Sequence, residues 1–224
     1  MGELILCSHP IAAMPYYIDN ISLNVYSLEE LCYYIENHLY LIEADFMSEE
    51  LCLWIGQELD EKDLAQSLRS VLLGNGSLSD FTELILRSRG YCSEDTIRHI
   101  RSVLLDMQNK SVFECSKIRA DRYMESEKYV KAIHEYQKLL GMEEECKKNP
   151  VLEGNIRHNL GTACAELFLF DEAAANFLNA YRLNRNRESL AACMAACRLA
   201  KKTDILKKYK EEFHVSDEAF KSMS

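Results

Sequence analysis

Cysteine and histidine side chains are the groups in this sequence that could support metal or nucleophilic chemistry. Cys193 and Cys197 lie four residues apart on a predicted helix and could share a zinc ion, with His214 as the nearest further ligand. Cys7 and His9 have the residue types of a nucleophile and its base. A structural zinc site needs four ligands, and catalytic pairs meet in space rather than in sequence. We therefore expect these residues to serve packing or to lie at the surface, and we expect no catalysis, no cofactor and no metal site.

Charge is distributed unevenly along the 224 residues, whose formal net charge is −10. Residues 1–68 contain 13 acidic residues and one base, Lys62, whereas residues 182–210 contain nine bases and two acids. The basic segment could attract the phosphates of a nucleic acid. Tyr209 is its one aromatic residue, however, and the chain as a whole is acidic. Nucleic acid is therefore a disfavoured partner.

Cysteine usage and hydropathy bear on the cellular compartment. Nine cysteines are scattered along the chain without a CxxC pair, which fits a reducing cytosol better than a disulfide scaffold. The N-terminal sequence MGELILCSHP has Glu3 where a signal peptide carries positive charge. No stretch approaches the ~18 consecutive apolar residues of a membrane-spanning helix. We therefore expect a cytoplasmic protein that does not span a membrane.

The elements that must position these side chains are mainly helices. Three Pro and eight Gly are few for a chain of this length, which favours long helices over many short strands. The first 26 residues differ, because Leu4–Cys7 and Ile21–Tyr26 are short apolar runs. These runs predict two short strands, or an irregular arm packed on helices.

Residues 27–109 predict about five helices with short connections. Ser27 is the predicted N-cap of the first helix, with Glu30 in the capping-box position, and the helical apolar spacing continues to Ile42. The Gly74–Gly76 segment is a strong helix breaker. The other predicted helix starts are Ser48, Glu61, Ser79 and Ser93.

Two stretches of the C-terminal half share one pattern of aromatic and small residues. The two series are Tyr129, Ala132, Tyr136 and Leu139, and Phe170, Ala173, Phe177 and Ala180. The intervals within each series are three, four and three residues, which place all members on one helix face. A small Ala on that face lets a neighbouring helix approach closely. Gly161 in the preceding predicted helix costs roughly 1 kcal/mol relative to Ala, which a close helix contact can offset.

The stretch NLGTACAELFLFDEAAANFLNAYRLN, residues 159–184, resembles a tetratricopeptide repeat. A weaker copy is KIRADRYMESEKYVKAIHEYQKLL, residues 117–140, and a degenerate third unit follows at residues 190–213. The two better copies are 41 residues apart, compared with about 34 in the family. The segment Met142–Pro150 can absorb the difference as a longer helix end or a loop. Departures from the family pattern occur at Arg119, Arg157 and Arg185.

The resemblance implies a stack of antiparallel helical hairpins that forms a right-handed superhelix. First helices supply most of the inner wall of such a stack, and this wall binds an extended or helical peptide. The implied wall residues are Lys117, Asp121, Met124, Asn155, His158, Asn159, Thr162 and Glu166. Lys117 and Asn159 match two places of the carboxylate clamp in chaperone-binding relatives, whereas Asp121, Ser189 and Cys193 depart from it. Helix capping or hydration is the alternative role for Asn155 and Asn159.

The sequence therefore predicts a mainly all-α protein with a short irregular or two-stranded N-terminal segment. We expect an acidic, mostly helical domain at residues 1–109, and tetratricopeptide-like repeats with a C-terminal capping helix at residues 110–224. The expected function is protein–protein interaction, as a co-chaperone-like scaffold or adaptor that binds a peptide or helix in the concave groove. The alternatives are a helical transcriptional regulator that contacts nucleic acid through the basic C-terminal region, and an enzyme with a site within residues 1–30.

Overall fold

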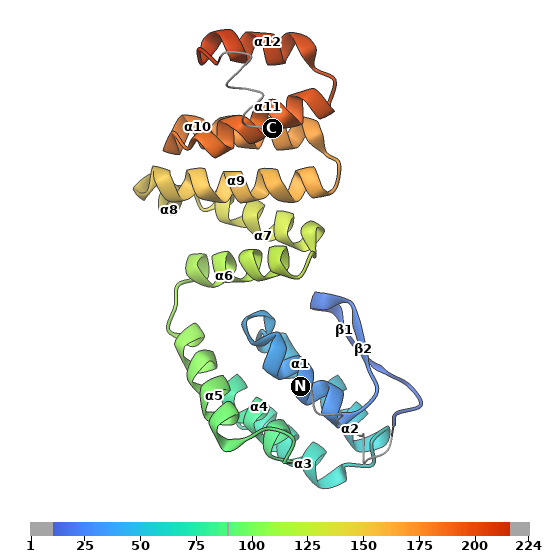
Figure 1. Cartoon of the computed structure of the whole chain (residues 1–224). Helices are drawn as coiled ribbons and strands as arrows, with labels where there is room; N and C mark the ends of the chain where they lie inside the picture. Colours follow the sequence, from blue (N-terminus) through green and yellow to red (C-terminus); the bar gives the residue numbers. More distant parts are fainter. Residues whose placement is uncertain (1–10, 89, 216–224) are drawn as a thin grey trace. The chain divides into compact units, whose positions relative to one another are not determined.

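The chain is mainly helical and divides into two compact units, unit 1 (Met1–Lys110) and unit 2 (Ser111–Ser224). The computed structural model describes residues 11–88 and 90–215. Within the described ranges there are twelve α-helices and a two-stranded antiparallel sheet near the N-terminus, which confirms the predicted all-α class (Figure 1). None of the helices in those ranges has the length and apolar composition needed to cross a bilayer. The predicted strand at Leu4–Cys7 and the predicted capping helix after Val215 lie outside the described residues.

The sheet pairs β1 (Tyr16–Ile18) with β2 (Leu23–Val25), so that Tyr16 lies opposite Val25 and Ile18 opposite Leu23. A 3-10 turn, η1 (Asp19–Ile21), connects the two strands. β2 lies within the predicted strand Ile21–Tyr26. β1 was not predicted, because three residues after a proline are too few to show the alternation that marks a strand.

Five helices follow in unit 1, and serine residues cap four of them. The helices are α1 (Leu28–Asn37), α2 (Glu49–Gln57), α3 (Lys62–Leu73), α4 (Leu78–Arg87) and α5 (Glu94–Gln108). The hydroxyl oxygens of Ser27, Ser48 and Ser93 each accept a hydrogen bond from the backbone N–H three residues later, as an N-cap does. The Glu30 carboxylate reaches the backbone N–H of Tyr26 at 2.6 Å, one residue before the position that a capping box uses.

Two predicted helix boundaries are wrong. The N-cap of α4 is Ser77, which forms a capping box with Asp80, whereas the predicted cap Ser79 is buried in the first turn. The first helix ends at Asn37 rather than continuing to Ile42, and a 3-10 turn, η2 (Leu39–Leu41), follows it. Leu39, Leu41 and Ile42 are nevertheless buried, so their apolar character reflects the core and not a continued helix.

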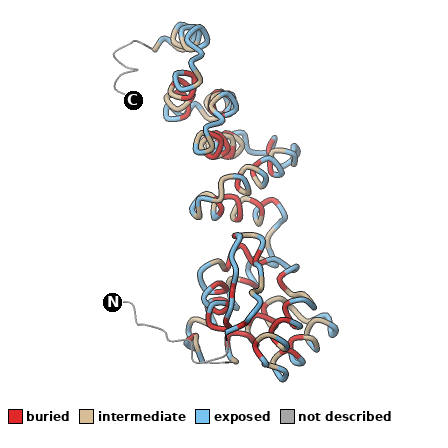
Figure 2. The backbone as a smooth tube through the Cα atoms, turned by 90° about the vertical axis from the view of Figure 1, so that its right-hand side faces the viewer, coloured by how far each residue is buried: buried red, intermediate tan, exposed pale blue. Residues whose placement is uncertain are grey.

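The core of unit 1 lies between α1, α2, α3, α4 and α5, each of which contributes buried side chains. Figure 2 colours the buried residues red. The fully buried aliphatic and aromatic side chains of this core include Leu31, Ile35, Leu51, Ile55, Leu68, Phe81 and Ile85. The ring of Phe46, from the 3-10 turn η3 (Ala44–Phe46), meets the edge of Phe81 at a centroid distance of 6.4 Å and lies 5.8 Å from Tyr34. The connection between α1 and α2 is therefore anchored in the core by an aromatic cluster.

Unit 2 is a row of helices in which consecutive long helices run antiparallel (Figure 1). They are α6 (Val112–Glu125), α7 (Tyr129–Gly141), α8 (Glu143–Lys148), α9 (Pro150–Glu166), α10 (Phe170–Asn184), α11 (Arg187–Leu199) and α12 (Thr203–Glu212). In this row α6 packs against α7, α7 against α9, α9 against α10, α10 against α11 and α11 against α12. The short helix α8 occupies most of the Met142–Pro150 segment, which is where the extra length between the two repeat copies was expected.

Three hairpins of unit 2 are closed by the same turn. Glu127, Phe168 and Lys201 all adopt the left-handed conformation, with φ of 58°, 61° and 58°. In each turn the next residue donates its backbone N–H to the carbonyl five residues earlier, at 2.8, 2.9 and 2.9 Å. The turns align α6–α7, α9–α10 and α11–α12 as equivalent hairpins, although Leu206 of α12 occupies the place of Ala132 and Ala173. No described residue of α12 is buried, as expected for a helix at the end of a row.

The three arginines that depart from the repeat pattern each have a local partner or a local role. Arg119 is buried in α6, where its Nε lies 3.8 Å from the Glu135 carboxylate of α7. Arg157 pairs with Glu153 one turn earlier at 2.7 Å. Arg185 ends α10 in the left-handed conformation, with φ of 56°, which a proline cannot adopt because its ring fixes φ near −65°.

Candidate functional site

Three of the predicted wall residues meet in one hydrogen-bonded network on unit 2. Lys117 and Asp121 are one turn apart on α6, and their Nζ and Oδ2 atoms are 2.6 Å apart. The Tyr136 hydroxyl of α7 donates to Oδ1 of Asp121 at 2.7 Å. The Asn159 amide of α9 lies 3.4 Å from the same Oδ1 atom and 3.3 Å from the Tyr136 hydroxyl. This network of Lys117, Asp121, Tyr136 and Asn159, called the Asp121 network below, joins three helices of two successive hairpins.

The surroundings of the Tyr136 hydroxyl in the Asp121 network determine its protonation state. Burial raises the pKa of Tyr136, and the hydrogen bond to the Asp121 carboxylate and its charge raise that pKa further. The phenol therefore stays protonated and donates. Because Asp121 already accepts from an ammonium, a phenol and an amide, its charge is compensated within the protein. The carboxyl group of a ligand would compete with Asp121 for Lys117, which is unfavourable for a carboxylate clamp.

Two further wall residues form a second cluster where α9 meets α11. Nδ1 of His158 lies 2.9 Å from the Ser189 hydroxyl, and the imidazole ring packs against Phe177 at a centroid distance of 5.2 Å. Burial lowers the pKa of His158, and the charge of Glu188 opposes this shift. Thr162 hydrogen-bonds the His158 carbonyl one turn earlier at 3.2 Å. This cluster is a polar contact between helices with a neutral imidazole at its centre.

The remaining wall residues join neither cluster. Asn155 is exposed and accepts a hydrogen bond from the Asn184 amide at 3.0 Å, across the α9–α10 hairpin. Glu166 is exposed in the last turn of α9, and Met124 is half-buried in the last turn of α6.

Tyr136 and Ser189 were not predicted as polar partners of the wall residues. The aromatic–alanine spacing marks Tyr136 as a core residue, and its ring is indeed buried. The available signal was the difference between Tyr136 and Phe177, which occupy the same repeat position and differ by one hydroxyl group. A hydroxyl at a buried position implies a hydrogen-bond partner nearby.

The cysteine pair of α11 is part of the packed interior. Cys193 and Cys197 are buried, with exposed fractions of 0% and 2%. The hydrogen bond to Cys197 and burial both raise the pKa of Cys193, so its thiol is a poor nucleophile. Among the described residues no group of three or more His, Cys, Asp or Glu side chains is placed to hold a metal ion. Cys7 and His9 lie outside those residues.

The basic C-terminal segment carries local ion pairs as well as exposed charge. Arg182 lies 3.4 Å from Glu212, and Lys202 lies 3.6 Å from Asp171. Lys207 and Lys208 are exposed on α12. No feature of the described part of this surface distinguishes a phosphate site from a solvated helix face.

The fold and the site together define an all-α protein whose second unit is a row of antiparallel helical hairpins. Hydrogen bonds between polar side chains connect neighbouring hairpins. No protein family, curated protein or solved structure matches the chain.

Proposed function

We propose that unit 2 is a tetratricopeptide-like module that binds a peptide through its first helices, α6, α9 and α11, as a scaffold or adaptor. The observation that carries this proposal is the row of three antiparallel helical hairpins, α6–α7, α9–α10 and α11–α12, in which each hairpin packs against the next. Successive hairpins of this kind build a superhelix with one wall of first helices, and such walls bind extended or helical segments.

Polar residues on the first helices support this proposal. Of the eight wall residues, Asn155 and Glu166 are exposed and the other six are half-buried, so all eight retain some access to solvent. Buried side chains of the same helices, such as Leu160 and Ala163, instead face neighbouring helices in the packed interior. A face with amide, carboxylate and hydroxyl groups held by a rigid scaffold suits hydrogen bonding to a peptide backbone.

The Asp121 network argues for a peptide that is recognised along its length rather than by its C-terminal carboxylate. Lys117 is the cation that a terminal carboxylate would need, and Asp121 already neutralises it at 2.6 Å. We therefore propose an internal peptide segment as the ligand. We place this binding in the cytosol, because nine scattered cysteines without a CxxC pair suit a reducing compartment.

A displayed random-peptide library, selected on the full-length chain, tests the proposal. Affinities of the enriched peptides are then measured for the wild type and for variants at the two exposed wall residues. We expect Asn155→Ala and Glu166→Ala together to weaken binding by about tenfold.

The matched control is Gln137→Ala on α7, a second helix of a hairpin. Gln137 is exposed and loses an amide just as Asn155 does. Its replacement should leave the affinity unchanged. Failure to enrich any peptide, or equal weakening by the control variant, would overturn the proposal.

A further inference from the structure

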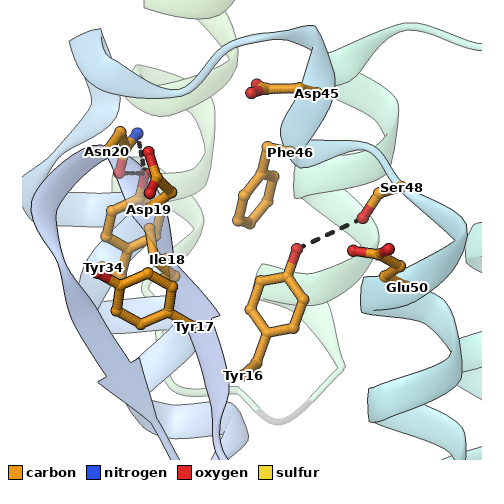
Figure 3. Close-up of a pocket in the computed structure, with 10 residues that line it drawn as sticks. All are labelled: Tyr16, Tyr17, Ile18, Asp19, Asn20, Tyr34, Asp45, Phe46, Ser48 and Glu50. Atoms are coloured by element: carbon orange, nitrogen blue, oxygen red, sulfur yellow. Dashed lines mark hydrogen bonds between the residues drawn. The ribbon is translucent and has the colours of Figure 1, made fainter.

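A pocket of about 330 Å³ lies in unit 1, between the β-hairpin and the segment that leads into α2 (Figure 3). The rings of Tyr16 and Phe46 lie at its centre, and the Tyr17 ring stands at one side. Pockets that hold small ligands are about 300–1,000 Å³, so this one is large enough for a single side chain or a small organic ion.

The aromatic part of the pocket is fixed in place. The Tyr16 hydroxyl is 3.4 Å from Oγ of Ser48, the N-cap of α2. Trp54 of α2 packs against the Tyr16 ring at a centroid distance of 5.7 Å, and its indole N–H donates to the Met14 carbonyl at 2.7 Å. Phe46 is held by the aromatic cluster of the core. The rings are therefore ordered without a ligand, which lowers the entropic cost of binding one.

Carboxylates surround these rings on three sides. Asp19, Asp45 and Glu50 occupy different edges of the pocket, as Figure 3 shows. The side chains of Asp45 and Glu50 make no hydrogen bond or ion pair with any part of the chain that the structure describes. No lysine, arginine or histidine is among the described residues that line the pocket. Burial raises the pKa of Tyr16 most, the hydrogen bond to Ser48 opposes this shift, and the charges of Glu50 and Asp45 add to it.

An aromatic centre with an acidic rim selects an organic cation. A cation over the face of an aromatic ring is attracted by the ring quadrupole, and the carboxylates add Coulomb attraction. A metal ion is a poorer fit, because the described carboxylates and histidines do not converge in a group of three. An anionic ligand would be repelled by Asp45 and Glu50, and an apolar ligand would leave these two carboxylates uncompensated.

We propose that this pocket binds an organic ammonium group, the side-chain ammonium of a lysine, methylated or not, in a basic peptide. The ammonium lies against Tyr16 and Phe46, with Asp45 and Glu50 as its counter-ions. This site is separate from the first-helix face of unit 2, and it does not depend on the function proposed for that face.

Fluorescence anisotropy with short labelled peptides tests the proposal on the full-length chain. The probe is an N-acetylated, otherwise neutral pentapeptide with one central lysine and an uncharged label. Matched peptides carry trimethyllysine or norleucine in its place. We expect the lysine or trimethyllysine peptide to bind at least about fivefold more tightly than the neutral norleucine peptide, and we expect added salt to weaken the binding.

Isosteric variants locate the site. Asp45 and Glu50 are exposed, so Asp45→Asn with Glu50→Gln removes two charges without disturbing the core. We expect this double variant to lose about fivefold in affinity. Asp63→Asn with Glu211→Gln removes two charges from exposed positions outside the pocket and should lose less than about twofold. Circular dichroism checks that each variant remains folded.

Competition separates a peptide ligand from a free amine. If choline or putrescine displaces the lysine peptide only at far higher concentration than an unlabelled lysine peptide does, a peptide is the ligand. Equal binding of the norleucine peptide, or unchanged affinity in the pocket double variant, would overturn the proposal. A free amine that outcompetes the peptide would overturn the assignment to lysine.

Discussion

Gly161 of α9 lies directly against the ring of Phe177 on α10. A Cβ atom at position 161 would be 2.8 Å from Cδ1 and 2.9 Å from Cε1 of Phe177, closer than real Cβ atoms approach other atoms. Ala173 and Ala180, on the same face of α10 as Phe177, are fully buried. Small residues on both helices thus allow the two helices of this hairpin to pack closely.

Replacement of Gly161 by alanine should therefore destabilise unit 2. Alanine is better than glycine in a helix by roughly 1 kcal/mol, but overpacking against a fixed aromatic ring costs about 1–3 kcal/mol. We expect Gly161→Ala to lower the free energy of unfolding by about 1 kcal/mol, measured by urea denaturation with circular dichroism. Gly141→Ala is the matched control, because nothing lies within 4 Å of its added Cβ. The close-packing account fails if both variants are equally stable.

The Tyr136 hydroxyl should contribute measurably to the stability of the α6–α7 hairpin. It donates to the charged Asp121 carboxylate at 2.7 Å, and hydrogen bonds to charged groups contribute about 1.5–3 kcal/mol. Since Asp121 is half-exposed and can be rehydrated, we expect Tyr136→Phe to cost about 1–2 kcal/mol in urea denaturation. Tyr129→Phe removes the same atom from the same helix at a hydroxyl without a hydrogen bond to the described residues. Tyr129→Phe should leave the free energy of unfolding nearly unchanged. An equal loss of stability in both variants would contradict the role of the Asp121 network.

The turn at Phe168 should become more stable when glycine replaces phenylalanine. Phe168 has a φ of 61° and is 79% exposed, so a left-handed conformation is imposed on a bulky side chain that packs little. The left-handed region costs a non-glycine residue about 1–2 kcal/mol. Glycine removes this cost, but part of the gain is lost because the unfolded chain becomes more flexible. We expect Phe168→Gly to raise the midpoint of thermal unfolding, and Glu127→Gly in the equivalent turn to act in the same direction. A lower midpoint in both variants would show that the turn is not the strained element.

The stability of unit 2 should depend on the protonation of His158. Its pKa is lowered from the ordinary value of 6.5, mainly by burial, so the folded protein binds this proton more weakly than the unfolded chain does. The free energy of unfolding therefore falls as the pH drops through about 6.5 and levels off below the folded pKa. We expect wild type to lose more stability than His158→Gln between about pH 7.5 and about pH 5.5. Parallel pH profiles would mean that His158 does not titrate differently in the two states.

Much of the helical organisation could be predicted from local sequence signals. Ser27 and Ser93 cap helices as predicted, and Ser48 caps the helix that was predicted to start there, because an N-cap is a short-range interaction between a hydroxyl and a nearby backbone N–H. The two aromatic–alanine series mark helices that begin at Tyr129 and Phe170, since their spacing reflects one buried face.

The rest depended on contacts between residues distant in sequence. The cap at Ser77 was missed because Ser79 has a similar context, and only the buried position of Ser79 separates the two. The Asp121 network needed the approach of Tyr136 and Asn159, which are 15 and 38 residues away from Asp121. The unit 1 pocket is lined by Tyr16, Phe46 and Glu50 from three elements, and no spacing in the sequence predicts that these residues lie close together.

The most direct test of the proposed peptide-binding face is photo-crosslinking to a peptide selected on the full-length chain. A benzophenone amino acid replaces Thr162, which is half-exposed on α9, or Gln137, which is exposed on α7. If the first helices bind the peptide, the Thr162 variant forms an adduct that unlabelled peptide suppresses, and the Gln137 variant forms none. An adduct from Gln137 and none from Thr162 would contradict the proposed binding face.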